Sequence, residues 1–198
     1  MSTMTTRKNS VVQDPPFAQF LFADTRAGWF WLIVRLWVGY QWIEASLHKL
    51  NEPGWVQTGE AVQGFWTRAI AIPESGRPPI SFEWYRSLLT MLLDTEAYRW
   101  MGPMIAYGEL LIGIALVLGL FTGIAAFFGG FLNWNFMMAG TASTNPVLFA
   151  MAVGLVLAWK VAGYIGLDHY VLPWLGTPWR GEEVEVDTPT PKPASSMV

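Results

Sequence analysis

Long apolar segments alternate with polar stretches along this chain and predict an all-α protein. Helices of about 17–21 residues span about 25–31 Å, close to the thickness of the hydrocarbon core of a membrane. The links after the second and third segments are short and uncharged, so we expect an integral membrane four-helix bundle. The predicted segments run from about Gly28 to His48, Trp100 to Leu120, Gly123 to Ala139 and Pro146 to Ile165.

The connection between the first two segments is long and mixed in character, which is often a sign of function. A Pro- and Gly-rich break at Ile72–Pro79 divides residues 51–98. On either side of it, Trp55–Ile70 and Ser81–Leu93 show amphipathic patterns. We therefore expect short interfacial helices in this loop, with Ser81 capping the second one.

The chain ends add two flanking regions to a membrane domain at residues 28–166. Residues 1–27 are predicted to form a tail and an interfacial segment, in which Phe17–Arg26 is either a short helix or a loop. Residues 167–198 begin with another aromatic interfacial segment. The last stretch, from Gly181, is acidic and Pro-rich, which is typical of a disordered tail.

Composition supports a membrane location and removes several kinds of chemistry. Hydrophobic residues make up 53% of the chain and charged residues 14%, against roughly 25% charged in soluble domains. Twelve Trp fit aromatic belts at the membrane surfaces. Cysteine is absent, and His48 and His169 would lie at opposite membrane faces. We therefore expect no metal, Fe–S or bis-His haem site within the chain, and a net charge of −3 gives no support for nucleic-acid binding.

The first segment carries two polar faces, and both should avoid lipid. Gln41, Glu44 and His48 share one face at helical spacing, while Arg35 and Lys49 share another. We expect Glu44 and His48 to form a protonatable pair at the mouth of a cavity roofed by residues 51–98. Since imidazole changes charge near neutral pH, His48 is the better candidate for a pH-dependent step. The alternatives are that His48 only caps the helix and that Lys49 only extends to the membrane surface.

Polar residues in the other segments suggest partners for these faces. Glu109 lies at a depth similar to that of Arg35, which predicts an ion pair that is either structural or functional. Asn133 and Asn135 point about 160° apart on one helix. We expect one of them to face the cavity and the other to bond a neighbouring helix.

Five motifs form an ordered set along the chain: Arg35, Gly39–Leu50, Asn51–Trp66, Gly108–Leu110 and Asn145–Pro146. Taken in this order, they resemble the DoxX/DoxD family of membrane proteins over about residues 28–166. The stretch Trp42–Trp66 looks most like the DoxD type, the membrane subunit attributed to thiosulfate:quinone oxidoreductase.

The resemblance implies oxidation of thiosulfate to tetrathionate, with quinone as electron acceptor and a small DoxA-type subunit as partner. It also implies a multi-pass protein of the cell membrane with both termini in the cytoplasm. Lys and Arg counts alone leave the orientation open. The main alternative function is a non-catalytic membrane subunit that docks onto a respiratory or photosynthetic complex, and a transporter, which would need dimerisation, is the third.

Quinone reduction needs an aromatic slot, hydrogen-bond donors and a proton route, and a sulfur anion needs positive charge. Glu44, His48 and Glu109 are the candidates for proton handling. The candidate binding residues are Arg35, Gln41, Trp42, Lys49, Trp66, Arg68, Arg86, Tyr107 and Asn133.

Overall fold

The computed structural model describes residues 14–176, and all regular structure in that range is helical. The all-α prediction is confirmed. The acidic tail predicted at the C-terminus lies outside the described residues. The helices are α1 (Pro16–Ala23), α2 (Gly28–Leu50), α3 (Pro53–Val56), α4 (Glu60–Ile70), α5 (Glu83–Asp94), α6 (Tyr98–Leu118), α7 (Thr122–Met138), α8 (Asn145–Leu157), α9 (Trp159–Ala162) and α10 (Asp168–Trp174), with a 3-10 turn η1 at Thr25–Ala27.

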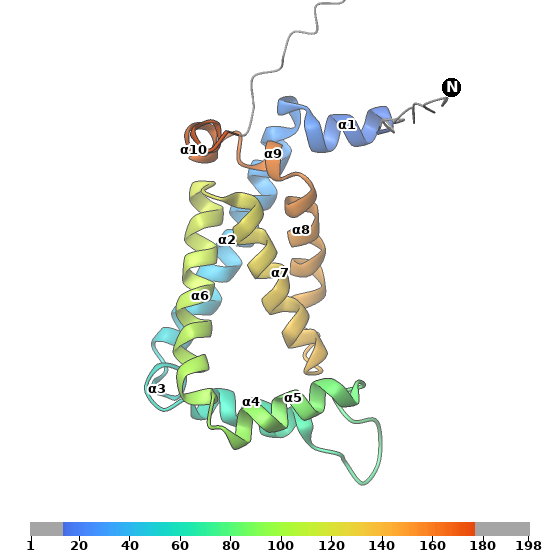
Figure 1. Ribbon diagram of the computed structural model, residues 1–198, viewed down its shortest axis with the longest axis vertical. Coiled ribbons are helices and arrows are strands. Elements are labelled where there is room, and N and C mark those ends of the chain that lie inside the picture. Colours follow the sequence, from blue (N-terminus) through green and yellow to red (C-terminus); the bar gives the residue numbers. More distant parts are fainter. Residues whose placement is uncertain (1–13, 177–198) are drawn as a thin grey trace, which may run out of the picture.

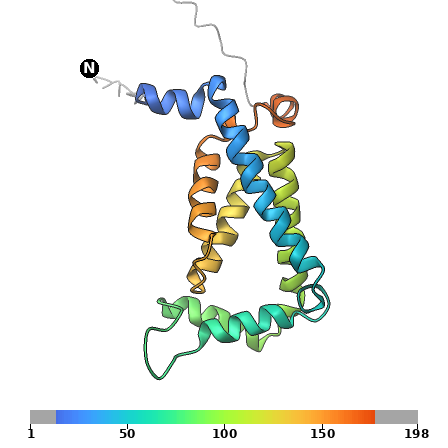
Figure 2. The same cartoon turned by 180° about the vertical axis from the view of Figure 1, so that it is seen from behind.

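Four long helices form the body of the molecule. α2 packs along α6, and α7 packs along α8. The two pairs meet near α9 and α10 and diverge toward the end where α4 and α5 lie across the bundle (Figure 1). The view from behind shows the same divergence, with α1 at the end opposite α4 and α5 (Figure 2). The long connection therefore covers the wide end of the bundle.

The predicted segments and the observed helices differ most where the chain bends without losing its apolar character. α2, α6 and α7 begin and end within about two residues of the predicted bounds. The fourth segment is interrupted at the buried residue Ala158, so that α8 is followed by the separate short helix α9. Hydrophobic pattern alone misses this break, because both sides of it are apolar.

Three expectations in the flanking and loop regions are settled by backbone geometry. The helical alternative for Phe17–Arg26 is the correct one, as α1. The single helix expected over Trp55–Ile70 is divided into α3 and α4 at Gly59, which has φ 76° and sits against the backbone of Tyr98. The predicted Ser81 cap is wrong, because Phe82 occupies the N-cap position of α5 and no side chain bonds there.

Among the described helices, α6 alone is both long enough and apolar enough to cross a membrane by itself. Only 33% of its most apolar window is buried inside the protein. α8 is apolar but shorter. The helical bundle is thus observed, together with one helix of membrane-spanning character.

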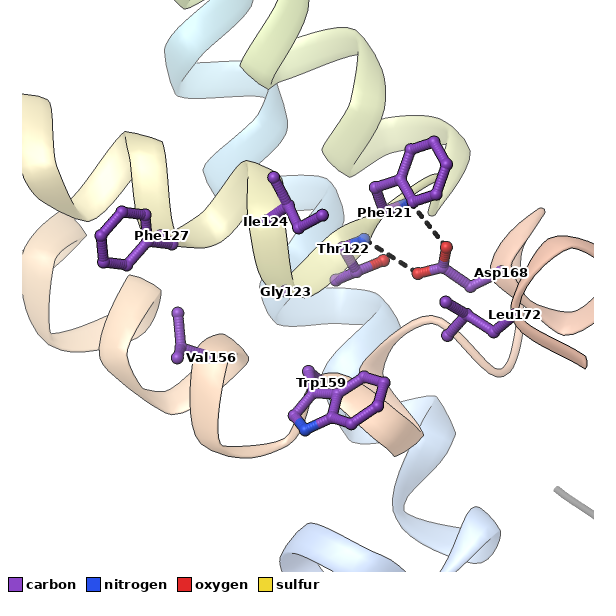
Figure 3. A pocket seen from close by; sticks show the side chains of 9 residues that line it. All are labelled: Phe121, Thr122, Gly123, Ile124, Phe127, Val156, Trp159, Asp168 and Leu172. Atoms are coloured by element: carbon purple, nitrogen blue, oxygen red, sulfur yellow. Dashed lines mark hydrogen bonds between the residues drawn. The ribbon is translucent and has the colours of Figure 1, made fainter. Parts of the chain in front are cut away.

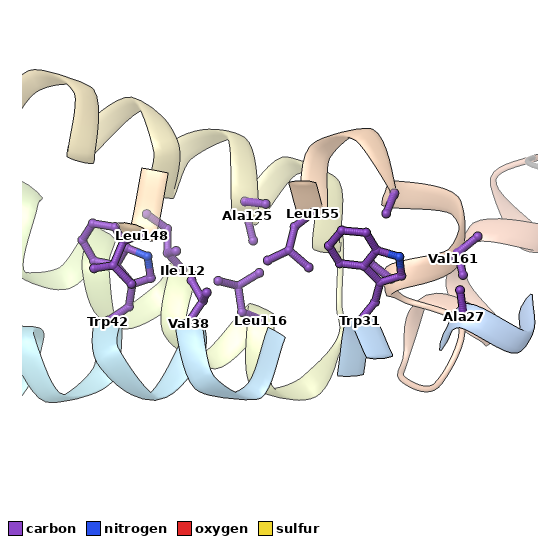
Figure 4. Packing of buried hydrophobic residues seen from close by; sticks show 13 residues of the cluster. Ala27, Trp31, Val38, Trp42, Ile112, Leu116, Ala125, Leu148, Leu155 and Val161 are labelled. Carbon is purple, nitrogen blue, oxygen red and sulfur yellow. The ribbon is translucent and has the colours of Figure 1, made fainter. Parts of the chain in front are cut away.

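The core of the bundle runs along the axis shared by the four long helices (Figure 4). α2 contributes the two large aromatic side chains, and the other helices contribute smaller aliphatic groups that pack between them. Its principal members are Trp31, Val38, Trp42, Ile112, Leu116, Ala125, Leu148 and Leu155.

Glycines set the close contact between α2 and α6. A Cβ on Gly113 would lie 2.9 Å from the carbonyl oxygen of Gly39 and 2.7 Å from Cγ1 of Ile43. The hydroxyl of Ser46 donates to the carbonyl of Ala106, 2.9 Å away. Small residues that let two backbones approach are a common device for packing apolar helices. Both contacts place the two helices in one antiparallel register.

We expect Gly113→Ala to lower the free energy of unfolding by about 1–3 kcal/mol, because the added methyl group forces α2 and α6 apart. Reversible unfolding of the purified protein measures this change. The control is Gly108→Ala on the same helix, where a Cβ would meet nothing within 4 Å. That variant should be neutral or slightly stabilising, since alanine favours helix over glycine. Equal effects of the two substitutions would contradict the close-packing explanation.

A second cluster of buried side chains holds α4 and α5 against the bundle. It includes Val62, Trp66, Leu89 and Tyr98. Tyr85 of α5 donates through its hydroxyl to the carbonyl oxygen of Asn135 at 3.0 Å and to its side-chain oxygen at 3.2 Å. Burial raises the pKa of Tyr85 to about 12, so the phenol keeps its proton. The connection is therefore a packed part of the fold.

Candidate functional site

A cavity of about 230 Å³ lies among α2, α6, α7 and α8, toward the end where the two helix pairs diverge. α2 provides half of the lining residues, and α6 contributes Glu109, which contacts Lys49 of α2. α7 and the start of α8 close the remaining sides. The lining residues are Gln41, Trp42, Glu44, Ala45, His48, Lys49, Glu109, Asn133, Phe136, Thr144, Asn145 and Leu148.

The wall from α2 combines the two polar faces expected from the sequence. Ala45 lies between those faces, and it lines the same cavity as Gln41 of one face and Lys49 of the other. Because 100° per residue separates successive side chains, a cavity facing Ala45 can be bordered by Glu44 on one side and Lys49 on the other. The two polar faces are thus the two edges of one site.

The cavity runs from an exposed rim to a buried floor. Glu44 and His48 are exposed, so they stand at the rim. Asn133 and Glu109 have no exposed surface, and Trp42 is 3% exposed. Burying a polar group costs free energy unless it forms a hydrogen bond within the protein or with a ligand. The site therefore joins accessible titratable groups to buried polar ones.

An ion pair between Lys49 and Glu109 lies in this wall. Nζ of Lys49 is 2.7 Å from Oε2 of Glu109 and also lies over the ring of Trp55, 5.2 Å from its centroid. The alternative that Lys49 only extends to the membrane surface is therefore wrong. Its side chain is 17% exposed and forms an ion pair with Glu109.

The predicted Arg35–Glu109 pair is wrong, and helix register is the reason. Gly39 lies opposite Gly113, which brings Glu109 level with Ile43. Arg35 is then about 12 Å away along the axis, eight residues at 1.5 Å each. Lys49 reaches Glu109 instead, because its long side chain extends back along α2 from the helix end.

Four buried polar atoms of the cavity wall have no hydrogen-bond partner among the described residues. They are Nε1 of Trp42, Oε1 of Glu109, and Nδ2 and Oδ1 of Asn133. An unsatisfied buried polar group costs about 1–3 kcal/mol. A cavity beside several such groups is where water or a polar ligand would satisfy them.

The two asparagines of α7 divide their roles as predicted. Asn133 lines the cavity. Asn135 donates to the carbonyl of Phe131 at 2.8 Å and accepts from Tyr85 of α5. One amide therefore faces the site while the other ties α7 to the connection that covers the wide end.

The remaining predicted site residues lie outside the cavity. Arg35 is at the other end of α2, Trp66 belongs to the core under α4, and Arg68 is exposed on α4. Tyr107 is 55% exposed, because two residues along α6 turn it away from the face that carries Glu109. These residues do not share one site with Glu44 and His48.

Arg86, a predicted anion-binding residue, instead donates hydrogen bonds to backbone carbonyls at both ends of the 71–79 loop. Its Nη1 donates to the carbonyl of Ile70 at 2.7 Å and its Nη2 to the carbonyl of Ile80 at 2.9 Å. Nε bonds Glu83 at 3.2 Å. The guanidinium therefore bridges the two ends of the 71–79 loop, and Arg86 does not line the cavity with Glu44 and His48.

Residues 51–98 were expected to roof the cavity, but they do not contact it directly. Among the described residues, none of those lining the cavity comes from 51–98. That connection reaches it indirectly, through Trp55 against Lys49 and through Phe65, whose ring lies edge-on to Phe136 at 6.3 Å. Sequence patterns did not identify Trp55, Thr144 or Phe136 as neighbours of the site, because only helix packing brings them there.

Arg35 marks a separate buried polar centre near α9 and α10. Nη2 of Arg35 donates to the carbonyl of Ile165 at 2.7 Å, and its guanidinium lies against Gly119 and Gly166. Asp168 provides electrostatic attraction for it. Asp168 accepts from the backbone nitrogens of Phe121 at 2.6 Å and Thr122 at 2.9 Å (Figure 3).

Asp168 thereby caps the start of α7, a role that the sequence did not reveal. The signal that could have identified it is a lone acid that follows a largely apolar stretch, two residues after Gly166. The groove next to it, of about 320 Å³, is otherwise apolar and is lined by side chains such as Ile124, Phe127 and Trp159 (Figure 3). Both oxygens of Asp168 are bonded, so none of the described residues lining this groove is an acid without a hydrogen-bond partner.

Within residues 14–176, no group of three or more His, Asp or Glu side chains is placed to hold a metal ion. Comparisons of the chain with family models, curated proteins and solved structures found no match. The resemblance to the DoxX/DoxD family therefore remains a prediction, and the candidate site stands on its own geometry.

Proposed function

We propose that the chain is a multi-pass membrane protein in which α2, α6, α7 and the α8–α9 pair cross the bilayer. The support is the apolar outer surface of the bundle. Ile33, Leu111, Phe127 and Leu157 are all exposed, one on each long helix. Contiguous apolar surface of this kind is rare on proteins that face water. α7, at about 26 Å, matches a bilayer only with some local thinning.

In this arrangement α4 and α5 lie at one membrane surface, and α1 and α10 lie at the other. α5 would rest on the lipid headgroups through the exposed side chains Trp84, Leu88 and Met91. The DoxX/DoxD resemblance would place α1, α10 and both termini on the cytoplasmic side. The cavity then opens near the outer surface.

Within the membrane, we propose that the cavity binds the headgroup of a quinone and delivers its protons. The observation that carries this proposal is the group of unpartnered atoms on Trp42, Glu109 and Asn133 beside a space of about 230 Å³. Sites for drug-sized ligands have volumes of about 300–1,000 Å³. This cavity is smaller, so it has room for a single ring such as a quinone headgroup. The indole of Trp42 provides an aromatic wall and an N–H donor.

Charge favours a neutral ring over a dianion in this space. Among the described residues lining the cavity, Lys49 is the one Lys or Arg, and Glu109 neutralises it. Glu44 adds a carboxylate at the rim. We therefore propose that a sulfur anion such as thiosulfate donates electrons from outside the cavity, directly or through a partner subunit.

Protons would enter at the rim. Reduction of a quinone by two electrons takes up two protons, one on each ring oxygen. Glu44 and His48 are exposed and lie one turn apart on α2, so they can exchange protons with water and pass them inward. Asn145 and Gln41 lie beside the same space as polar neighbours.

The test is quinone reduction by the purified protein in lipid nanodiscs, with thiosulfate as donor and a short-chain benzoquinone as acceptor. We expect turnover in the unmodified protein and a loss of about 100-fold in both Glu44→Gln and His48→Ala, the scale of a lost acid–base step. Tyr107→Phe, on the outer face of α6, is the control and should keep full activity.

Three results would count against this proposal. Failure of the benzoquinone to bind at all would remove the quinone site. Persistent co-purification with a larger respiratory or photosynthetic complex, without turnover in isolation, would favour the docking subunit instead. Unchanged turnover in both variants would reduce Glu44 and His48 to polar residues that end a membrane helix.

A further inference from the structure

The unpartnered atoms of the cavity differ in what they can bond. Nε1 of Trp42 is a donor only. The amide of Asn133 both donates and accepts, so it can serve any polar ligand. Oε1 of Glu109 accepts only while the carboxylate is ionised, and the ion pair of Oε2 with Lys49 at 2.7 Å favours that form.

A quinone and its quinol differ in the hydrogen bonds that they can form with these unpartnered atoms. A quinone carries two carbonyl oxygens, which accept hydrogen bonds and donate none. It can satisfy Trp42 and the Asn133 amide hydrogens, but it leaves Oε1 of Glu109 facing a second acceptor. A quinol hydroxyl satisfies Glu109 by donating to it, and its oxygen still accepts from Trp42 or Asn133.

We propose that this cavity is selective for the reduced ligand: it binds quinol more tightly than quinone because Oε1 of Glu109 requires a donor. The inference rests on the proposed quinone site and adds the redox form that it prefers. One hydroxyl would bond Glu109 at the buried floor, while the other faces the rim at Glu44 and His48.

The preference has a consequence for electron transfer. A site that binds the reduced form ten times more tightly raises the two-electron potential of the bound couple by about 30 mV. The oxidised ligand then becomes a stronger acceptor at the site than in the open membrane. That direction helps a weak reductant, such as a sulfur anion, to reduce it.

The ammonium group of Lys49 allows Glu109 to serve as a buried hydrogen-bond acceptor. An isolated carboxylate at such depth would be expelled or neutralised by a proton. Lys49 occupies Oε2 and leaves Oε1 free, and Trp55 holds the ammonium from the other side. A lysine held by both groups favours the charged form of Glu109 and leaves Oε1 without a partner among the described residues.

Anaerobic titration calorimetry of the full-length protein in nanodiscs tests this proposal. The probes are a short-chain benzoquinone and its chemically reduced quinol. We expect the quinol to bind at least tenfold more tightly, the scale of one buried hydrogen-bonding group left without a partner. Tyr107→Phe should keep that ratio.

The decisive variant is Lys49→Met/Glu109→Leu, which removes the acceptor without leaving a charge buried alone. Its thermal unfolding is measured first, to show that the bundle is retained. We expect the ratio of the two affinities to fall to about one, mainly through weaker quinol binding.

The possible results separate the inference from the function on which it rests. Equal binding of the two forms by the unmodified protein would overturn the quinol preference and leave a quinone site. An unchanged preference in the double variant would overturn the role of Glu109. Binding of neither form would remove the proposed function itself.

Discussion

Lys49→Met is expected to lower the free energy of unfolding by about 3–5 kcal/mol, the usual cost of leaving one partner of a buried ion pair alone. Glu109 has no exposed surface, and Nζ of Lys49 at 2.7 Å is its one hydrogen-bond partner among residues 14–176. Methionine keeps the length of the side chain and its packing against Trp55, so the loss reports mainly the charge.

The double variant Lys49→Met/Glu109→Leu should recover most of that stability, since it buries no charge. Reversible unfolding in mixed detergent micelles, analysed as a double-mutant cycle, gives the coupling energy. The matched pair is Arg35→Met with the same Glu109→Leu, which should show little coupling because register separates these two residues by about 12 Å. Coupling to Arg35 instead of Lys49 would contradict the observed register.

Asp168→Ala is expected to cost about 3–5 kcal/mol at the opposite end of the bundle. The carboxylate is fully buried and accepts from the backbone nitrogens of Phe121 and Thr122. Hydrogen bonds to a charged group contribute about 1.5–3 kcal/mol each, and their loss would leave the start of α7 uncapped. The buried guanidinium of Arg35 would also lose electrostatic attraction.

Asp168→Asn is the matched control, because its side-chain oxygen can still accept one of the two bonds. It should cost roughly half as much as the alanine variant in the same unfolding measurement. Adding Arg35→Met to Asp168→Asn should recover part of the loss, since no unpaired cation then remains buried. An alanine variant as stable as the unmodified protein would show that α7 begins without this cap.

The long helices and one face of the site could be predicted from sequence because both depend on local periodicity. Runs of apolar residues located α2, α6 and α7 closely. Gln41, Glu44 and His48 fall on one side of α2 by spacing alone, and they do line one cavity. The opposite directions of Asn133 and Asn135 follow from the same helical geometry.

Tertiary packing decided the features that depend on two segments at once. The close contact of Gly39 with Gly113 sets the register between α2 and α6. In this register Glu109 forms its ion pair with Lys49 and not with Arg35. Arg86 carries the charge expected of an anion site, but the carbonyls of Ile70 and Ile80 occupy its donors. Asp168 looked like part of a terminal segment and caps α7 instead.

The sequence by itself thus determined that this protein is helical, where its long helices run, and which residues of α2 share a face. Those properties follow from the 3.6-residue period and from apolar composition, which act within a single segment. Which polar groups meet, which remain unpartnered and how deep they lie were decided by the tertiary structure alone. A shift of a few residues between two antiparallel helices moves a side chain by several ångströms, and no pattern within either helix encodes that shift.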